Sequence, residues 1–170
     1  LFPREFNGLE LGEFYIHEPG GMLSNLLIVA FSLWFAFRLN SKSGGLSRNF
    51  RGFYFCLAIG GFGGIFSHGL PHLLGEELFY YVWAVKNTFV PVANYFALMG
   101  VLSLVSVDKI VFTKRLLMVK CGIAIISLWW FYSFLPAVFD LAITYILIII
   151  LTSKNLDITG LRTLRTAFLT

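Results

Sequence analysis

The sequence predicts an all-α protein, a polytopic helical membrane bundle with five spans and its amino terminus outside. Of its 170 residues, 58% are apolar, 18% aromatic and only 13% charged, which lies outside the usual composition of soluble domains. The apolar residues gather in runs of about 20, enough to cross roughly 30 Å of hydrocarbon. Basic segments follow alternate runs, which is the charge pattern of a multi-pass chain.

The spans follow from the apolar runs and from the residues that interrupt them. Glu76 and Glu77 interrupt the long apolar stretch between the second and third spans. Leu135-Pro136 separates the fourth span from the fifth, because proline disfavours helical geometry in the residue before it. Both connections are therefore expected to be tight hairpins. The predicted helices cover residues 22–39, 52–74, 78–106, 116–134 and 137–152.

The expected domain organisation is a single membrane domain. Residues 1–21 form an extramembrane amino-terminal segment and residues 22–152 form the transmembrane bundle. Residues 153–170 are a cytoplasmic-side tail, either an interfacial helix or the start of a further span. The sequence leaves open whether the natural chain continues beyond Thr170.

Positive charge sets the expected orientation. The basic residues fall in the segments 38–51 and 108–120 and in the tail after Lys154, all on one side of a five-span topology. The positive-inside rule assigns that side to the cytoplasm or its equivalent, so the amino terminus lies outside. The net charge of +4 thus comes from short juxtamembrane segments. We expect membrane lipids, above all anionic headgroups, as partners, and no nucleic acid.

Two histidines, His68 and His72, mark the candidate site. An ionisable side chain inside an apolar span usually faces protein, water or a metal rather than lipid. The two residues continue a row at spacing four, and such a row shares one face of a helix. The members of this row are Gly60, Gly64, His68, His72 and Glu76.

A zinc site is one interpretation of these histidines, since two histidines at i and i+4 can bind one zinc ion. Glu76, or the outer residues His17 and Glu18, would then complete the ligand set. However, Pro71 lies between the two histidines and is expected to bend the helix there. The residues therefore favour polar packing, in which each ring bonds to a neighbouring helix, over a metal site.

Other polar or small residues within the spans have similar alternatives. Lys86 either snorkels outward or pairs with Asp140, the only carboxylate inside a predicted span. Asn94 is expected to make interhelical hydrogen bonds. Gly60 and Gly64 belong to a glycine run that favours close packing with a neighbouring helix, the alternative being a lipid or pigment tail against bare backbone.

The entry to the first span resembles a known family. The stretch Glu18-Pro19-Gly20-Gly21-Met22-Leu23-Ser24-Asn25 resembles the E-P-x-N-x-x-S-N entry of the alkaline-ceramidase-like family of the CREST superfamily. His68 stands where that family has the last residue of S-x-x-x-H, and the resemblance covers roughly residues 13–95. It implies a seven-helix fold, of which this chain holds five helices, and a zinc ion held by three histidines for hydrolysis of a lipid amide.

The chain departs from the family pattern at several positions. Gly64 stands in place of the family serine and Gly21 in place of the first asparagine. No aspartate follows His68 before Asp108, and no histidine follows His72. A catalytic zinc site needs about three protein ligands and an open position for water. The resemblance supplies one of these ligands, His68.

Two main classes of function remain from the sequence. The first is a non-catalytic structural or accessory subunit with a ceramidase-like scaffold that binds lipid and other membrane proteins. The second is a zinc-dependent lipid amide hydrolase whose remaining metal ligands lie beyond Thr170. The first class explains the missing serine, aspartate and histidines directly, so we rank it higher. A transporter or proton relay built around His68, His72 and Lys86 is a third alternative.

Overall fold

The computed structural model describes residues 8–11, 14–39, 44–104 and 110–154. Over these residues the protein is an all-α bundle with one short β-hairpin, which confirms the predicted fold class. The strands are β1 (Leu9–Leu11) and β2 (Phe14–Ile16). The helices are α1 (Pro19–Arg38), α2 (Gly45–Gly69), α3 (Pro71–Leu102), α4 (Ile110–Phe131) and α5 (Leu135–Lys154).

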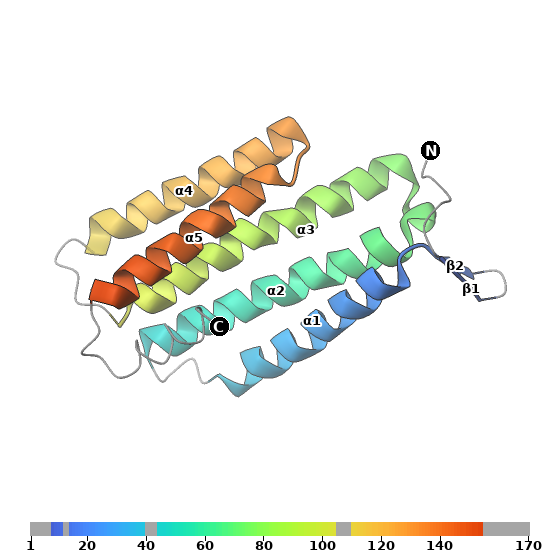
Figure 1. Ribbon diagram of the computed structural model, residues 1–170. Helices are drawn as coiled ribbons and strands as arrows, with labels where there is room; N and C mark the ends of the chain where they lie inside the picture. Colours follow the sequence, from blue (N-terminus) through green and yellow to red (C-terminus); the bar gives the residue numbers. More distant parts are fainter. Residues whose placement is uncertain (1–7, 12–13, 40–43, 105–109, 155–170) are drawn as a thin grey trace.

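Helix α3 is the centre of the bundle. It packs against α2 on one side and against α4 and α5 on the other, while α1 packs against α2 (Figure 1). The helices run up and down, so the connections after α1 and α3 lie at one end and those after α2 and α4 at the other. The two connections that we expected to be tight, those after α2 and α4, are short.

Three helices are long and apolar enough to cross a membrane: α1, α2 and residues 135–153 of α5. Helices α3 and α4 carry charged residues along their length, Lys86 in α3 and Lys120 in α4. The apolar surface of α1 faces outward, and Leu23, Phe31 and Phe37 are each more than half exposed, at 58%, 58% and 71%. Exposed apolar side chains gathered along one helix in this way are typical of a surface that contacts lipid or another protein.

The boundary between the second and third helices differs from the predicted one. Helix α2 ends at Gly69, where the Leu70 N–H makes a last bond to the Phe66 carbonyl. Pro71 then begins α3, a favoured position because proline has no N–H to leave unpaired in the first turn. The predicted continuation of one helix to residue 74 was therefore wrong. His68 and His72 belong to different helices, so the predicted single row at spacing four ends at His68.

The break predicted at Glu76 and Glu77 corresponds to a kink one residue earlier, inside α3, while the connection between α2 and α3 lies at Leu70. The irregularity nearby is Gly75, whose φ of 67° and ψ of 169° interrupt the helical geometry. Residues other than glycine rarely adopt a positive φ. Gly75 thus supplies the kink that turns the first turn of α3, with His72, away from the rest of the helix.

The β-hairpin was not predicted from the sequence. Its strands pair in antiparallel register, with Glu10 opposite Tyr15. Two backbone hydrogen bonds fasten its end to α2: the His17 N–H bonds to the Gly69 carbonyl and the Glu18 N–H to the His68 carbonyl, both at 3.0 Å. The hairpin therefore places the residues just before α1 beside the carboxyl end of α2.

The alternatives for residues 153–170 fall almost entirely on residues 155–170, outside the described part of the chain. The same holds for Asp108 and Lys109 in the predicted basic segment between the third and fourth helices. Helix α4 begins at Ile110, earlier than predicted, so Lys120 lies well inside this helix instead of at its edge.

Candidate functional site

Four polar side chains form a continuous chain of contacts where α1, α2 and α3 meet. Glu18 Oε2 lies 2.6 Å from His68 Nδ1, and His68 Nε2 lies 3.1 Å from Lys86 Nζ. Lys86 Nζ also donates a hydrogen bond of 2.6 Å to Ser67 Oγ. The order of contacts is therefore Glu18, His68, Lys86 and Ser67, and we call these residues the polar cluster.

The neighbours of His68 determine which ring nitrogen carries its proton. An ammonium group has donors only, so His68 Nε2 must accept the hydrogen bond from Lys86. A neutral imidazole then carries its proton on Nδ1 and donates it to the Glu18 carboxylate. The ring thus separates an acid from a base, and both of its nitrogens are engaged.

The local sequence explains why Glu18 reaches His68. Glu18 is the residue before Pro19, at the N-cap of α1, yet its side chain makes no capping hydrogen bond. The carboxylate turns to α2 instead, and the hairpin bonds hold the backbone in place for this contact. Gly21 allows the close approach, since a Cβ atom there would lie 3.2 Å from both Glu18 Oε2 and His68 Cβ.

The glycine run of α2 lies against both neighbouring helices. A Cβ atom at Gly60 would lie 3.3 Å from the Lys86 carbonyl oxygen, and one at Gly63 would lie 2.8 Å from Lys86 Cβ. A Cβ atom at Gly64 would overlap the side-chain amide of Asn25 in α1. The run therefore brings α1 and α3 close to α2 on two faces, rather than on the one face that a row at spacing four describes.

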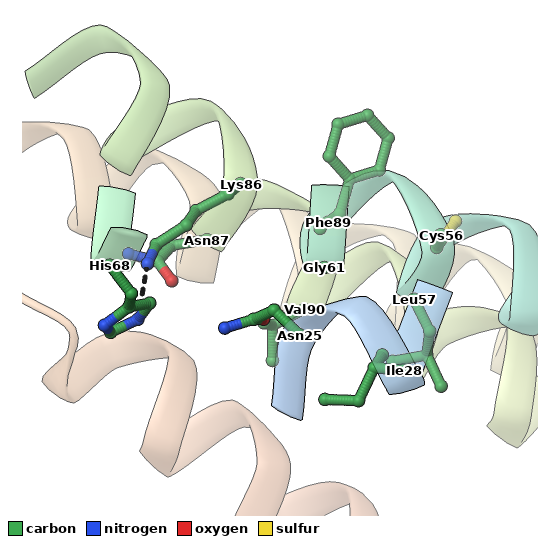
Figure 2. Close-up of a pocket in the computed structure, with 11 residues that line it drawn as sticks. Asn25, Ile28, Cys56, Leu57, Gly61, His68, Lys86, Asn87, Phe89 and Val90 are labelled. Atoms are coloured by element: carbon green, nitrogen blue, oxygen red, sulfur yellow. Dashed lines mark hydrogen bonds between the residues drawn. The ribbon is translucent and has the colours of Figure 1, made fainter. Parts of the chain in front are cut away.

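A cavity of about 240 Å³ adjoins the polar cluster between α1, α2 and α3. Figure 2 shows His68, Lys86, Asn87 and Asn25 toward one end, and Cys56, Leu57 and Ile28 toward the other. The cavity thus has a polar end and an apolar end. Its lining residues are Asn25, Ile28, Cys56, Leu57, Gly60, Gly61, His68, Lys86, Asn87, Phe89 and Val90.

Of the predicted metal ligands, the described structure brings Glu18 to His68, whereas His17, His72 and Glu76 do not join them. His72 is exposed in the first turn of α3, and its ring centroid lies 6.3 Å from that of Tyr15. His17 directly follows β2, and its ring centroid also lies 6.3 Å from that of Tyr15. Glu76 is exposed. Among the described residues, no group of three or more His, Cys, Asp or Glu side chains could hold a metal ion.

The hydrogen-bond partners of His68 also do not fit a role for this residue as a zinc ligand. Zinc binds a neutral imidazole through a free ring nitrogen. Here His68 Nδ1 faces Glu18, and the Lys86 ammonium stands at Nε2, where it would repel a cation. The described residues around His68 therefore fit polar packing and not a zinc ion.

A second polar group joins α3, α4 and α5. Lys120 Nζ lies 2.6 Å from Asp140 Oδ1 and donates a 2.8 Å hydrogen bond to Thr144 Oγ1. Asn94 Nδ2 donates a 2.8 Å bond to Asp140 Oδ2, as expected for an interhelical contact. The partner of Asp140 is therefore Lys120, so the alternative in which Lys86 pairs with Asp140 was wrong.

The remaining sequence candidates, Ser24 and Asn25, support the start of α1. Both side chains donate to the Gly21 carbonyl oxygen, Ser24 Oγ at 2.9 Å and Asn25 Nδ2 at 2.8 Å. Asn25 also reaches the cavity wall, next to Gly64. It therefore links the entry of α1 to the candidate site.

Sequence reasoning missed three members of these groups, Ser67, Lys120 and Thr144. Ser67 was not among the sequence candidates, yet Lys86 of α3 donates a hydrogen bond to its side chain. Lys120 was counted among the basic residues near the membrane surface, although a buried carboxylate such as Asp140 requires a cationic or hydrogen-bonding partner. The sequence could have indicated this pair, because the Asp140 carboxylate needs a partner and Lys120 lies in the preceding helix, α4.

The architecture defines a class of protein before any comparison: an α-helical bundle with three helices long and apolar enough to cross a membrane. The chain belongs to a family of unknown function (DUF6962), whose family model matches residues 21–165. The match includes all five helices except the first two residues of α1. No curated protein and no solved structure matches the chain.

Proposed function

We propose that this protein is a multi-pass integral membrane protein that binds an anionic amphiphile between α1, α2 and α3 without catalysing a reaction on it. The observation that carries the proposal is the continuity of the polar cluster with an apolar cavity of about 240 Å³. An acidic headgroup would meet Lys86, and the adjoining part of an acyl chain would occupy the apolar end.

The charge of Lys86 supports an anionic ligand. An ammonium group has three N–H donors, and Ser67 and His68 accept two of them within the described structure. The Glu18 carboxylate stands on the far side of the His68 ring and does not contact Lys86 directly in these hydrogen bonds. A cation inside an apolar bundle gains most from a partner of opposite charge, and Lys86 itself lines the cavity.

The size and lining of the cavity support an amphiphile over a compact polar molecule. Pockets that enclose a whole small ligand usually measure roughly 300–1,000 Å³. A cavity of about 240 Å³ takes only part of a long ligand. Ile28, Leu57, Phe89 and Val90 offer apolar contacts to that part. The rest of the acyl chain would lie along the outer apolar surface, in the bilayer.

The membrane topology is part of this proposal. Five helices would cross the bilayer, with the basic ends of α1, α2 and α4 on the cytoplasmic side and the hairpin outside. The outward apolar face of α1 supports contact with lipid. Binding of other membrane protein subunits stays a prediction.

We also propose that the scaffold is ceramidase-like. The support is spatial: the two motifs behind that resemblance meet, since Glu18 contacts His68 and Asn25 lies against Gly64. The departure at Gly64 has a packing reason, because any Cβ atom there would overlap the Asn25 amide. The hydrolase alternative has less support, because His17, His72 and Glu76 do not converge on His68 and the described donors do not fit zinc.

Matched ligands test the proposed binding. Dodecanoate and dodecanol share a chain length and differ in headgroup charge, so we expect the purified full chain in a nonionic detergent to bind dodecanoate on the order of 10-fold more tightly. Lys86→Met should remove this preference, whereas Lys114→Met, which removes an exposed lysine of α4, should retain it. Val90→Trp, which fills the apolar end, should weaken both ligands.

Binding by isothermal titration, with thermal unfolding to check the fold of each variant, measures these effects. Equal affinity for the acid and the alcohol would contradict the proposal. So would a preference for dodecanoate that survives Lys86→Met in a folded protein.

A further inference from the structure

A second pocket, unrelated to the polar cluster, lies between the first half of α3 and the end of α4. Its volume is about 460 Å³. Its lining is aromatic with one carboxylate and consists of Glu77, Tyr80, Tyr81, Ala84, Trp129 and Tyr132. We call these residues the aromatic pocket. All but Tyr132, which directly follows α4, come from α3 and α4, and these two helices pack against each other.

The backbone of Tyr132 is strained where it lines the aromatic pocket. Its φ is 46°, the only positive φ of a residue other than glycine in the described part of the chain. Tyr132 directly follows the last residue of α4, Phe131, where glycine commonly takes up this conformation. Strained residues of this kind are concentrated at ligand sites. The positive φ of Tyr132 is a property of the backbone and is therefore independent of which side chains line the pocket.

Trp129 is fixed in the pocket by a hydrogen-bonded relay. Its indole N–H donates a 3.0 Å bond to Thr88 Oγ1, and Thr88 donates a 2.9 Å bond to the Ala84 carbonyl oxygen. The single polar group of the indole is therefore used by the protein, and the rest of the Trp129 side chain is apolar aromatic surface. Its neighbour Trp130 does not line the pocket and is 77% exposed.

We propose that the aromatic pocket binds a quaternary ammonium group. The faces of tyrosine and tryptophan rings attract cations, and aromatic walls are the known way to recognise trimethylammonium. Such a group has no N–H to donate, so it needs no hydrogen-bond acceptors. Glu77 supplies the complementary negative charge at the rim. Tyr80, Tyr81, Trp129 and Tyr132 supply the walls.

An aromatic belt at a membrane surface is the alternative explanation for tyrosines and tryptophans at this level. A belt requires neither a pocket shared by two helices nor a carboxylate. The ligand chemistry has two sources, a choline lipid headgroup or a free choline-type cation. Both present the same trimethylammonium, and the experiment below distinguishes them.

The first experiment uses the purified full chain in a detergent without choline groups. Choline and ethanolamine differ only in the methylation of the ammonium, so we expect choline to bind more tightly, on the order of 10-fold, by isothermal titration. In parallel, nanodiscs of phosphatidylcholine and phosphatidylethanolamine with identical acyl chains give a competition for retained lipid by native mass spectrometry. Selective retention of phosphatidylcholine assigns the lipid headgroup as source, and selective choline binding alone assigns the free cation.

The second experiment separates binding from structure. Tyr132→Gly removes one wall and relieves the positive φ, so it should keep or raise the melting temperature while reducing choline selectivity about 10-fold. Glu77→Gln should also weaken choline. Trp130→Phe changes an exposed aromatic outside the pocket and should leave selectivity unchanged. The proposal is overturned if neither choline nor phosphatidylcholine is preferred, or if Tyr132→Gly keeps full selectivity. Neither result bears on dodecanoate binding at Lys86.

Discussion

Lys120 of α4 and Asp140 of α5 form an ion pair at 2.6 Å in which only 1% of the Asp140 side chain is exposed. Asn94 and Thr144 complete the hydrogen bonding of the two charges. The pair joins α4 to α5, and the hydrogen bond from Asn94 joins Asp140 to α3, whereas the polar cluster joins the start of α1 to α2 and α3. Helix α3 thus contributes to both of these polar groups, Lys86 to one and Asn94 to the other.

Removal of Asp140 is predicted to destabilise the protein strongly. Asp140→Ala leaves the Lys120 ammonium without its partner, and breaking a buried pair in this way costs about 3–5 kcal/mol. The double variant Lys120→Met/Asp140→Leu should recover most of that loss, because it leaves no buried charge. Thermal or denaturant unfolding in detergent measures both, and a single variant as stable as the wild type would refute the role of the pair.

The approach of α1 to α2 is predicted to depend on Gly64. Gly64→Ala places a Cβ atom against the Asn25 amide, and overpacking of this kind costs about 1–3 kcal/mol. Gly122→Ala is the matched control in α4, since a Cβ atom there meets nothing within 4 Å. We expect the control to be close to neutral. Similar melting temperatures for the two variants would mean that α1 packs differently.

The kink in α3 is predicted to require glycine. Gly75→Ala forces a residue with a Cβ atom into a φ of 67°, with a cost of about 1–2 kcal/mol. Gly20→Ala, at an exposed helical position with nothing within 4 Å of the added atom, should cost little. If Gly75→Ala instead raised the melting temperature, α3 would continue as a regular helix through this position.

The protonated nitrogen of His68 is predicted to depend on Glu18. In the wild type the proton resides on Nδ1, since Lys86 occupies Nε2. Glu18→Gln keeps an oxygen acceptor and should retain this tautomer, whereas Glu18→Ala removes the acceptor and should change it. ¹⁵N NMR of histidine-labelled protein, with His68→Asn to assign the signal, measures the tautomer. A wild-type ring protonated on Nε2 would contradict the geometry.

The helices could be predicted from the sequence because hydropathy marks them directly. The predicted range 137–152 and the observed α5, Leu135–Lys154, differ by two residues at each end. The start of α2 at Gly45 was harder to predict, because its first turns contain Arg48, Asn49 and Arg51, which read as loop. Hydropathy indicates which residues can lie in an apolar medium, and it does not indicate where a helix begins or ends. The polar ends of the helices therefore extend beyond the predicted spans.

The partners within the site could be predicted only in part. His68 was identified because a charge inside an apolar run is costly. Its actual neighbours depend on a hairpin fastened to α2 and on the break at Leu70, and periodicity carries neither piece of information. The sequence contained the relevant signal in Pro71, a favoured first residue of a helix, which was interpreted as a bend within one helix.

Site-directed thiol labelling tests the central claim, a five-span bundle with its basic ends on one side of the membrane. In a chain with Cys56→Ser and Cys121→Ser, single cysteines are introduced at Arg48 and Ser103 for one end and at Glu10 and Ser133 for the other. A membrane-impermeant maleimide applied to sealed right-side-out vesicles should label the Glu10→Cys and Ser133→Cys variants and spare the other two. Labelling of all four from one side, or of Arg48→Cys together with Glu10→Cys alone, would contradict the account.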